Sequence, residues 1–267
     1  MIAVAMTNLG NFRPCLKLHR KWHSGEVSKP MPCQQSRTIS PITETGTEPA
    51  KIHLTLGVPV HLTLPKQNRG GARNTASRQS DNLTANQVAN LIAGASHAGA
   101  IGLPFTRMIT IHWQAAGIPL EGMARATGRF TDLLTKAVAR HGHKSAWLWV
   151  HENGHGKGGH VHILAHVPPL LAPLVKRLQK GWLRTITGQP YIAKVIKSDP
   201  IGGRLGLETG NPELHAVNLE AALAYVLKGA SHEAGPQFGL GRLEPGGLVI
   251  GKRCSTSQNI GPAARMR

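Results

Sequence analysis

Two histidines in one apolar run are the residues of this chain best placed to bind a metal ion. His160 and His162 lie two positions apart in GGHVHILAHV, residues 158–167. Successive side chains on a strand point to opposite faces, so these two imidazoles share a face and can reach one ion. Glu152 stands at the end of the preceding apolar run. Two imidazoles and one carboxylate form a three-ligand divalent site that keeps positions open for substrate and water.

A glycine-rich loop separates Glu152 from the two histidines and predicts a hairpin. Its glycines are Gly154, Gly156, Gly158 and Gly159. A hairpin brings Glu152 beside His160 and His162, but the neighbouring His151 is an alternative third ligand. A histidine-rich stretch is also typical of a solvated surface, and the hairpin arrangement is what favours the metal site.

Tyr225 is the candidate nucleophile. It lies three residues before Lys228 in ALAYVLKG, so the two side chains share a face of the expected helix 219–227. A phenol attacks a phosphodiester when a divalent ion makes the phosphorus more electrophilic or when a nearby ammonium, such as that of Lys228, stabilises the phenolate. Half-buried packing is the alternative role for this tyrosine.

The charge of the chain predicts a polyanionic partner, and nucleic acid is the leading candidate. The net charge is +18 and the aromatic fraction is 4%, so contacts to phosphates should dominate over base stacking. A soluble basic protein without such a partner is the alternative. The residues predicted to contact DNA are Arg107, Lys157, Lys194, Lys197, Arg242, Lys252 and Arg253.

The elements that must position these side chains follow from hydrophobic periodicity. The first helix is expected after Asp81, Asn82 and Thr84. The last helix, 219–227, is expected to be capped by Asn218. Between them we expect strand 105–113, helix 120–140, strands 146–152 and 159–167, helix 170–186, strand 191–198 and a short strand 213–217. The predicted class is α+β, with a split βαββαβ (ferredoxin/RRM-like) antiparallel sheet that carries its helices on one face.

Three regions are expected along the chain. Residues 1–80 read as a basic, largely disordered region in which 51–64 alternate as one or two short strands, residues 81–230 as the catalytic domain, and residues 231–267 as a basic C-terminal extension. The N-terminal region is either a basic arm that touches DNA or a dispensable segment. Three widely spaced cysteines and the lack of a signal or membrane-spanning segment favour a reducing cytoplasm.

These motifs together resemble the HUH endonuclease superfamily, in particular the single-tyrosine initiators of rolling-circle replication. The matching stretches are GGHVHILAHVP for the motif of two histidines, YVLK for the nucleophile motif and ITIHW for the amino-terminal motif, within residues 103–230. Tyr225 lies on a helix after the histidines, as the family pattern requires. The second tyrosine of the chain, Tyr191, is expected on a strand.

The resemblance implies nicking of one DNA strand at a plasmid or phage origin. Tyr225 would form a 5′-phosphotyrosine link and leave a free 3′-hydroxyl, while His160, His162 and Glu152 would hold Mg²⁺ or Mn²⁺ and Lys228 would neutralise the phosphate. The substrate would be single-stranded or origin-hairpin DNA. No GxxxxGK[ST] motif is present in the sequence, so a host helicase would separate the strands.

Other functions stay open from the sequence. A mobilisation relaxase or a transposase of the same superfamily would carry the same motifs, although the position of Tyr225 after the histidines favours the initiator. A histidine-triad nucleotide hydrolase needs a further histidine where this chain has Leu164. A non-catalytic basic nucleic-acid-binding protein would leave Tyr225 as packing.

Overall fold

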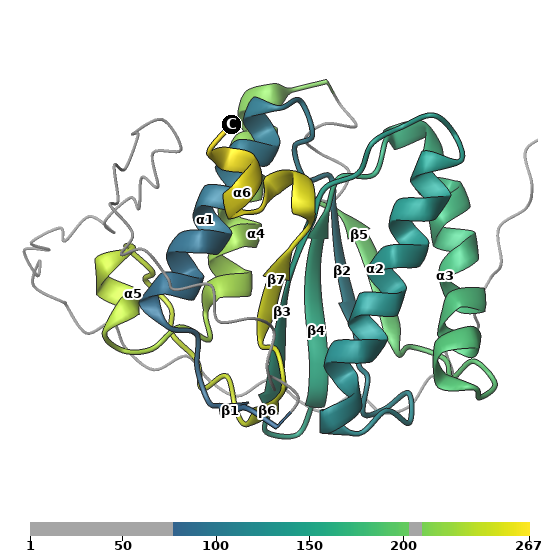
Figure 1. Ribbon diagram of the computed structural model, residues 1–267, viewed down its shortest axis with the longest axis horizontal. Helices are drawn as coiled ribbons and strands as arrows, with labels where there is room; N and C mark the ends of the chain where they lie inside the picture. Colours follow the sequence, from purple (N-terminus) through teal and green to yellow (C-terminus); the bar gives the residue numbers. More distant parts are fainter. Residues whose placement is uncertain (1–76, 203–209) are drawn as a thin grey trace, which may run out of the picture. The chain divides into compact units, whose positions relative to one another are not determined.

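Strands from distant parts of the chain form one antiparallel sheet in the computed structural model, which describes residues 77–202 and 210–267 (Figure 1). The order across the sheet is β5-β2-β4-β3-β7, and each neighbouring pair is antiparallel. The strands are β2 (Arg107–Ile111), β3 (Trp147–Gly154), β4 (Gly158–Ala165), β5 (Ile196–Pro200) and β7 (Cys254–Thr256). The fold is therefore α+β, as predicted.

Helices cover both faces of this sheet, so the expectation of helices on one face is corrected. Helices α2 (Met123–Ala139) and α3 (Ala172–Thr187) lie on one side, and α1 (Ala85–Ala100) and α4 (Pro212–Leu227) lie on the other (Figure 1). Each side has its own apolar cluster: Val161 and Ile163 of β4 pack with α2 and α3, whereas Leu164 packs with α1 and α4. The alternation along β4 is what divides its side chains between the two layers.

Shorter elements complete the described part of the chain. Strands β1 (Gln79–Ser80) and β6 (Val249–Ile250) pair with each other antiparallel. The remaining elements are the 3₁₀ turns 120–122, 169–171 and 258–260 and the helices α5 (Ala234–Gln237) and α6 (Pro262–Arg265). All of these described elements belong to one compact unit.

Local sequence signals explain where the helices begin. Thr84 caps α1 through a capping box with Gln87, and this helix starts where the sequence predicts it. Helix α4 begins at Pro212 behind the cap Asn211, whose side chain accepts a hydrogen bond from the backbone N–H of Leu214. The predicted strand 213–217 and the predicted cap Asn218 are therefore wrong, because both lie inside α4.

The last strand before α4 is shorter than the sequence suggests. The expected strand 191–198 begins only at Ile196, because the preceding residues turn and Lys194 adopts a left-handed backbone with φ 68°. Tyr191 consequently lies outside a strand, partly buried against the core on the α2/α3 side.

Part of the expected C-terminal extension belongs to the sheet. Cys254 and Thr256 of β7 pair with Val150 and Leu148 of β3. The predictions for residues 1–76, including the short strands in 51–64, lie outside the described residues. Among the helices that are described, none combines the length and the apolar character needed to cross a bilayer.

Candidate active site

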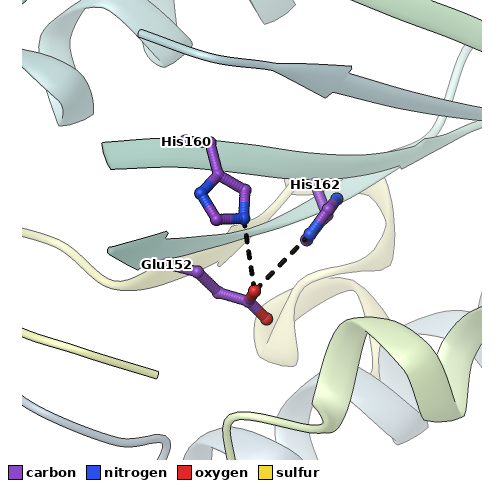
Figure 2. A group of neighbouring side chains, drawn as sticks. All are labelled: Glu152, His160 and His162. Atoms are coloured by element: carbon purple, nitrogen blue, oxygen red, sulfur yellow. Dashed lines mark ion pairs between the residues drawn. The ribbon is translucent and has the colours of Figure 1, made fainter. Parts of the chain in front are cut away.

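Glu152, His160 and His162 meet on the sheet face that α1 and α4 cover, and all three are buried (Figure 2). Glu152 of β3 is directly opposite His160 of β4, and His162 follows two positions later on the same face. The Glu152 Oε2 atom lies 3.3 Å from His160 Nε2 and 3.5 Å from His162 Nε2. The predicted three residues are thus brought together by one hairpin.

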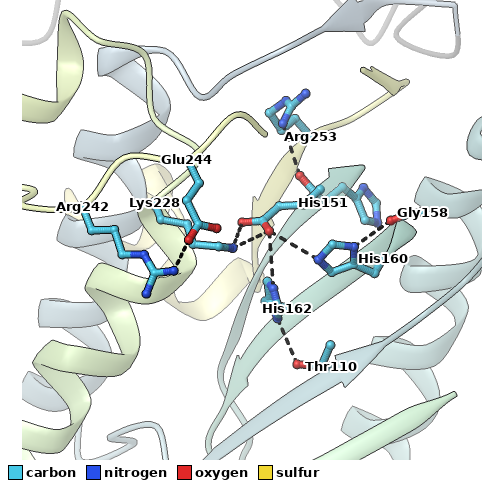
Figure 3. A network of polar contacts seen from close by, with 10 residues as sticks. Thr110, His151, Gly158, His160, His162, Lys228, Arg242, Glu244 and Arg253 are labelled. Atoms are coloured by element: carbon cyan, nitrogen blue, oxygen red, sulfur yellow. Dashed lines mark hydrogen bonds and ion pairs between the residues drawn. The ribbon is translucent and has the colours of Figure 1, made fainter. Parts of the chain in front are cut away.

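Hydrogen bonds fix the far side of each imidazole. His160 Nδ1 is 2.8 Å from the carbonyl oxygen of Gly158, and His162 Nδ1 is 2.9 Å from Thr110 Oγ1 (Figure 3). A carbonyl oxygen only accepts, so His160 Nδ1 carries the hydrogen and its Nε2, when the ring is neutral, holds a lone pair. Such outer partners orient the histidine ligands of metal sites.

The arrangement of donor atoms fits a divalent cation. In the neutral ring, the lone pair of His160 Nε2 faces the Glu152 carboxylate, and a proton or a metal ion between them removes that repulsion. His162 Nε2 is buried and, at 3.5 Å from Glu152, makes no aligned hydrogen bond. Two imidazole nitrogens and one carboxylate oxygen suit several divalent transition metals.

Electrostatics place the ligands in the forms that bind metal. Burial alone would raise the pKa of the Glu152 carboxyl, but His160, His162 and the charge of Lys228 lower that pKa well below the usual range. Burial lowers the pKa of His162, although Glu152 acts in the opposite direction. Near neutral pH the carboxylate is therefore ionised and His162 is neutral, as coordination requires.

Lys228 is part of the cluster. Its side chain is buried at the C-terminal end of α4, and Nζ contacts both carboxylate oxygens of Glu152 (Figure 3). The same Nζ lies 4.4 Å from the centroid of the Tyr225 ring. The expected phosphate-neutralising residue is thus the counter-ion of Glu152 in this structure, and it also faces the candidate nucleophile.

Tyr225 stands at the solvent side of the cluster. Its ring centroid lies 5.1 Å from that of His162, and the residue is 36% exposed. Lys197 of β5 is exposed and pairs in register with Thr110, so it lies on the same face of the sheet as His162, and a hydrogen bond to Asp199 raises the pKa of its ammonium. A buried acid–base cluster with an accessible tyrosine beside it can position a phosphodiester for attack.

His151 is excluded as the third ligand, because it points to the opposite face of the sheet. Its Nε2 lies 2.8 Å from Thr127 Oγ1 of α2, and its Nδ1 lies 2.9 Å from the carbonyl oxygen of Lys252. Burial lowers the pKa of this histidine to about 4, so it is neutral near pH 7. Both of its ring nitrogens therefore make hydrogen bonds on the α2 side of the sheet and are not available to a metal ion at Glu152.

The residues predicted to contact DNA lie on different parts of the fold. Lys157 in the hairpin turn and Lys197 on β5 are exposed near the cluster, and Lys194 is exposed in the preceding loop. Arg107 shares the face of Ile109 and Ile111, on the α2/α3 side of the sheet.

The three predicted DNA contacts in residues 231–267 differ in their exposure to solvent. Arg242 is exposed and paired with Glu244, and Lys252 is exposed and donates to Ser255 Oγ at 2.8 Å. Arg253 contradicts its prediction as a DNA contact, because it is buried and donates to Ser80 and to backbone carbonyl oxygens. Its burial follows from its position beside β7.

Two residues of the site were not singled out from the sequence. His112 follows β2, and its ring stacks on His160 with centroids 5.3 Å apart. Thr110 supports His162. Alternation along a strand puts Thr110 and His112 on one side of the sheet, but only the pairing of β2 with β4 places them beside the histidines.

Comparison of the chain with family models, with curated proteins and with solved structures found no match. Its function is therefore argued from the geometry of the site.

Proposed function

We propose that this protein nicks single-stranded DNA through Tyr225, with a divalent metal ion held by Glu152, His160 and His162. The observation that carries the proposal is the position of Tyr225, whose accessible ring lies 5.1 Å from His162 at the border of the buried Glu/His/His cluster. A nucleophile beside a metal site with a carboxylate and two imidazoles suits phosphodiester chemistry.

The reaction transfers a phosphoryl group of DNA from its 3′-oxygen to the oxygen of the tyrosine, and the proton that the phenol loses balances the one that the 3′-oxygen gains. The Tyr225 oxygen forms a bond to phosphorus as the bond from phosphorus to the 3′-oxygen breaks, so the 5′-phosphate stays on the enzyme and the 3′-oxygen leaves as a hydroxyl. The bound ion would supply charge stabilisation on the scissile phosphate. Lys228 Nζ lies 4.4 Å from the centroid of the Tyr225 ring, which puts its positive charge beside the attacking group.

Initiation of rolling-circle replication is the process that we infer for this activity. The motifs in the sequence support it. The order β2-α2-β3-β4-α3-β5 along the chain and β5-β2-β4-β3 across the sheet also supports it, because this is the order expected of a split βαββαβ core. The nicked strand would be exposed in single-stranded or origin-hairpin DNA, with a host helicase acting ahead of synthesis. A mobilisation relaxase or a transposase would use the same chemistry.

One observation favours a second candidate, a nucleic-acid-binding protein without catalysis. Lys228 contacts both oxygens of Glu152, so the cluster also satisfies itself as a buried ion-pair network. In that case, Tyr225 would be packing at the edge of α4.

The two tyrosines of the chain allow a matched test. Purified protein is incubated with Mn²⁺ and a panel of single-stranded oligonucleotides that tile its own replicon, and covalent adducts are sought on a denaturing gel. We expect an adduct that Tyr225→Phe abolishes and Tyr191→Phe retains, because Tyr191 lies beside Lys180 on the other side of the sheet. No adduct on any strand would reject the enzyme and favour the binding protein.

A further inference from the structure

The two helices on the face opposite the candidate site present a surface rich in cations. Helices α2 and α3 lie side by side (Figure 1). Phe130 of α2 packs against Trp182 of α3, with 5.5 Å between the ring centroids. Between them they expose eight basic side chains, which we call the α2/α3 basic surface: Arg125, Arg129, Lys136 and Arg140 along α2, and Lys176, Arg177, Lys180 and Arg184 along α3.

These cations are arranged in stripes that face away from the sheet. At about 100° per residue, the four on α2 fall within an arc of about 60° and the four on α3 within about 100°. The buried residues of both helices, such as Phe130 and Leu183, pack toward the sheet. At a rise of about 1.5 Å per residue, the stripe on α2 is about 22 Å long, which matches about six base pairs of a duplex.

The charge on this surface is not neutralised within the described part of the chain. Asp132 is the single acid on α2 and α3, and it pairs with Lys136 at 2.8 Å. The other seven cations have no ion pair among residues 77–202 and 210–267. The helices on the site face differ, because α1 and α4 contain no Lys or Arg and carry two acids, Glu213 and Glu220.

The surface suits duplex rather than single-stranded nucleic acid. Proteins that hold single strands combine cations with aromatic rings on which bases stack. The described large exposed side chains include one aromatic residue, Tyr225, which lies on the other face. Tyr191 is partly buried and lies under Lys180, 5.4 Å from Nζ to ring centroid. Contacts limited to phosphates are those that a duplex backbone offers.

We propose that the α2/α3 basic surface binds the sugar-phosphate backbone of duplex DNA. Binding would be largely independent of base sequence and strongly dependent on salt, since each phosphate contact releases counterions. The idea that the bound duplex is continuous with the nicked strand rests on the proposed function. Duplex binding by this surface does not depend on that function.

The test replaces charges on each helix separately in the full-length protein. The variants are R125Q/R129Q/K136Q/R140Q on α2 and K176Q/R177Q/K180Q/R184Q on α3, each with a charge-preserving control in which Lys and Arg are exchanged at the same positions. A fluorescent duplex of about two helical turns and a single strand of the same sequence are titrated by anisotropy across a salt series. Circular dichroism verifies folding, and adduct formation on a short single strand is measured in parallel.

We expect each glutamine variant to weaken duplex binding at least tenfold and to reduce the slope of log affinity against log salt by about two to four. The charge-preserving controls should bind like the parent, and adduct yield on the short strand should change by less than about twofold. Duplex affinity and slope close to those of the parent would overturn the proposal. So would an equal loss for the single strand, or an equal loss in the charge-preserving controls. If the parent forms no adduct, the proposed nicking fails, while the duplex titrations still decide this inference.

Discussion

The two faces of the central sheet are built from the same strands but carry different chemistry. On the α1/α4 side, Glu152, His160 and His162 form a buried polar cluster beneath helices that lack Lys and Arg. On the α2/α3 side, the neighbouring residues His151 and Val161 are locked in a packed core, and the cations are on the outer surface of the helices. One-residue alternation along a strand is enough to separate a candidate reaction site from a candidate binding surface.

This difference shows how a strongly basic chain, with a net charge of +18, can hold a buried cluster whose donor atoms suit a cation. If the helices above the cluster carried the exposed cations, they would repel a divalent ion near Glu152. Lys228, at the C-terminal end of α4, does reach the cluster, but its charge is paired with the Glu152 carboxylate. The eight cations of the α2/α3 basic surface can attract DNA from the opposite face without opposing metal binding.

The largest expected effect separates His160 from His151, which stand on adjacent strands but on opposite faces. His160→Ala removes a ligand and should lower metal-dependent adduct formation by about 1000-fold, while salt-sensitive DNA binding stays intact. His151→Ala should cost about 1–3 kcal/mol of stability and leave the Mn²⁺ dependence unchanged. Adduct yield against Mn²⁺ concentration measures both, and an equal shift in the two variants would contradict the division between faces.

Removal of Lys228 tests the charge balance inside the cluster. Lys228→Met leaves Glu152 buried without its counter-ion, so we expect the metal-free protein to lose about 3–5 kcal/mol of unfolding free energy. Mn²⁺ should restore part of this loss, because a bound ion compensates the carboxylate. Urea denaturation with and without Mn²⁺ measures the effect. The double variant Glu152→Gln/Lys228→Met should be more stable than Lys228→Met, and the reverse order would argue against the charge explanation.

Thr110 offers a smaller and more specific change. Thr110→Val removes the hydroxyl beside His162 Nδ1 and should weaken Mn²⁺ binding by about 10–100-fold, as measured by calorimetry. Thr106→Val is the matched control, since Thr106 Oγ1 donates to the carbonyl oxygen of Val167 at 2.8 Å and serves packing. Equal Mn²⁺ affinities in the two variants would remove Thr110 from the site.

The smallest effect concerns the single acid of the α2/α3 basic surface. Asp132→Asn frees Lys136 and should strengthen duplex binding by a few-fold, while the unfolding free energy changes by less than about 0.5 kcal/mol. Anisotropy at low salt measures the gain, and adduct formation on a short single strand serves as the control. Weaker duplex binding in this variant would place the duplex elsewhere.

Local patterns in the sequence predicted most of the site. The glycine loop before His160 and His162 predicted the hairpin that brings Glu152 beside them, because a hairpin is a short-range structure. The choice between Glu152 and His151 required the face of β3, which depends on the register with β4. His112 and Thr110 were missed as site residues for the same reason, since the pairing of β2 with β4 joins residues about fifty positions apart.

The remaining errors in the fold also have physical causes. Asn218 was read as a helix cap, although Asn211-Pro212-Glu213 carries the stronger signal of a capping side chain, a proline in the first turn and an acid beside it. The second layer of helices was not predicted, because a continuous apolar run such as residues 146–150 is equally consistent with a strand covered on one face or on both. Strand β7 is three residues long, too short for a periodic pattern.

The position of β7 affects what an incomplete chain would do. Tyr225 and Lys228 precede β7, so a product that ends between them and Cys254 would contain every side chain assigned to the reaction. It would lack the strand that pairs with Leu148–Val150, and β3 would become an open edge with unpaired N–H and C=O groups beside Glu152. Such an edge invites pairing with other chains. Premature termination should therefore produce aggregates rather than a folded protein that keeps the candidate site.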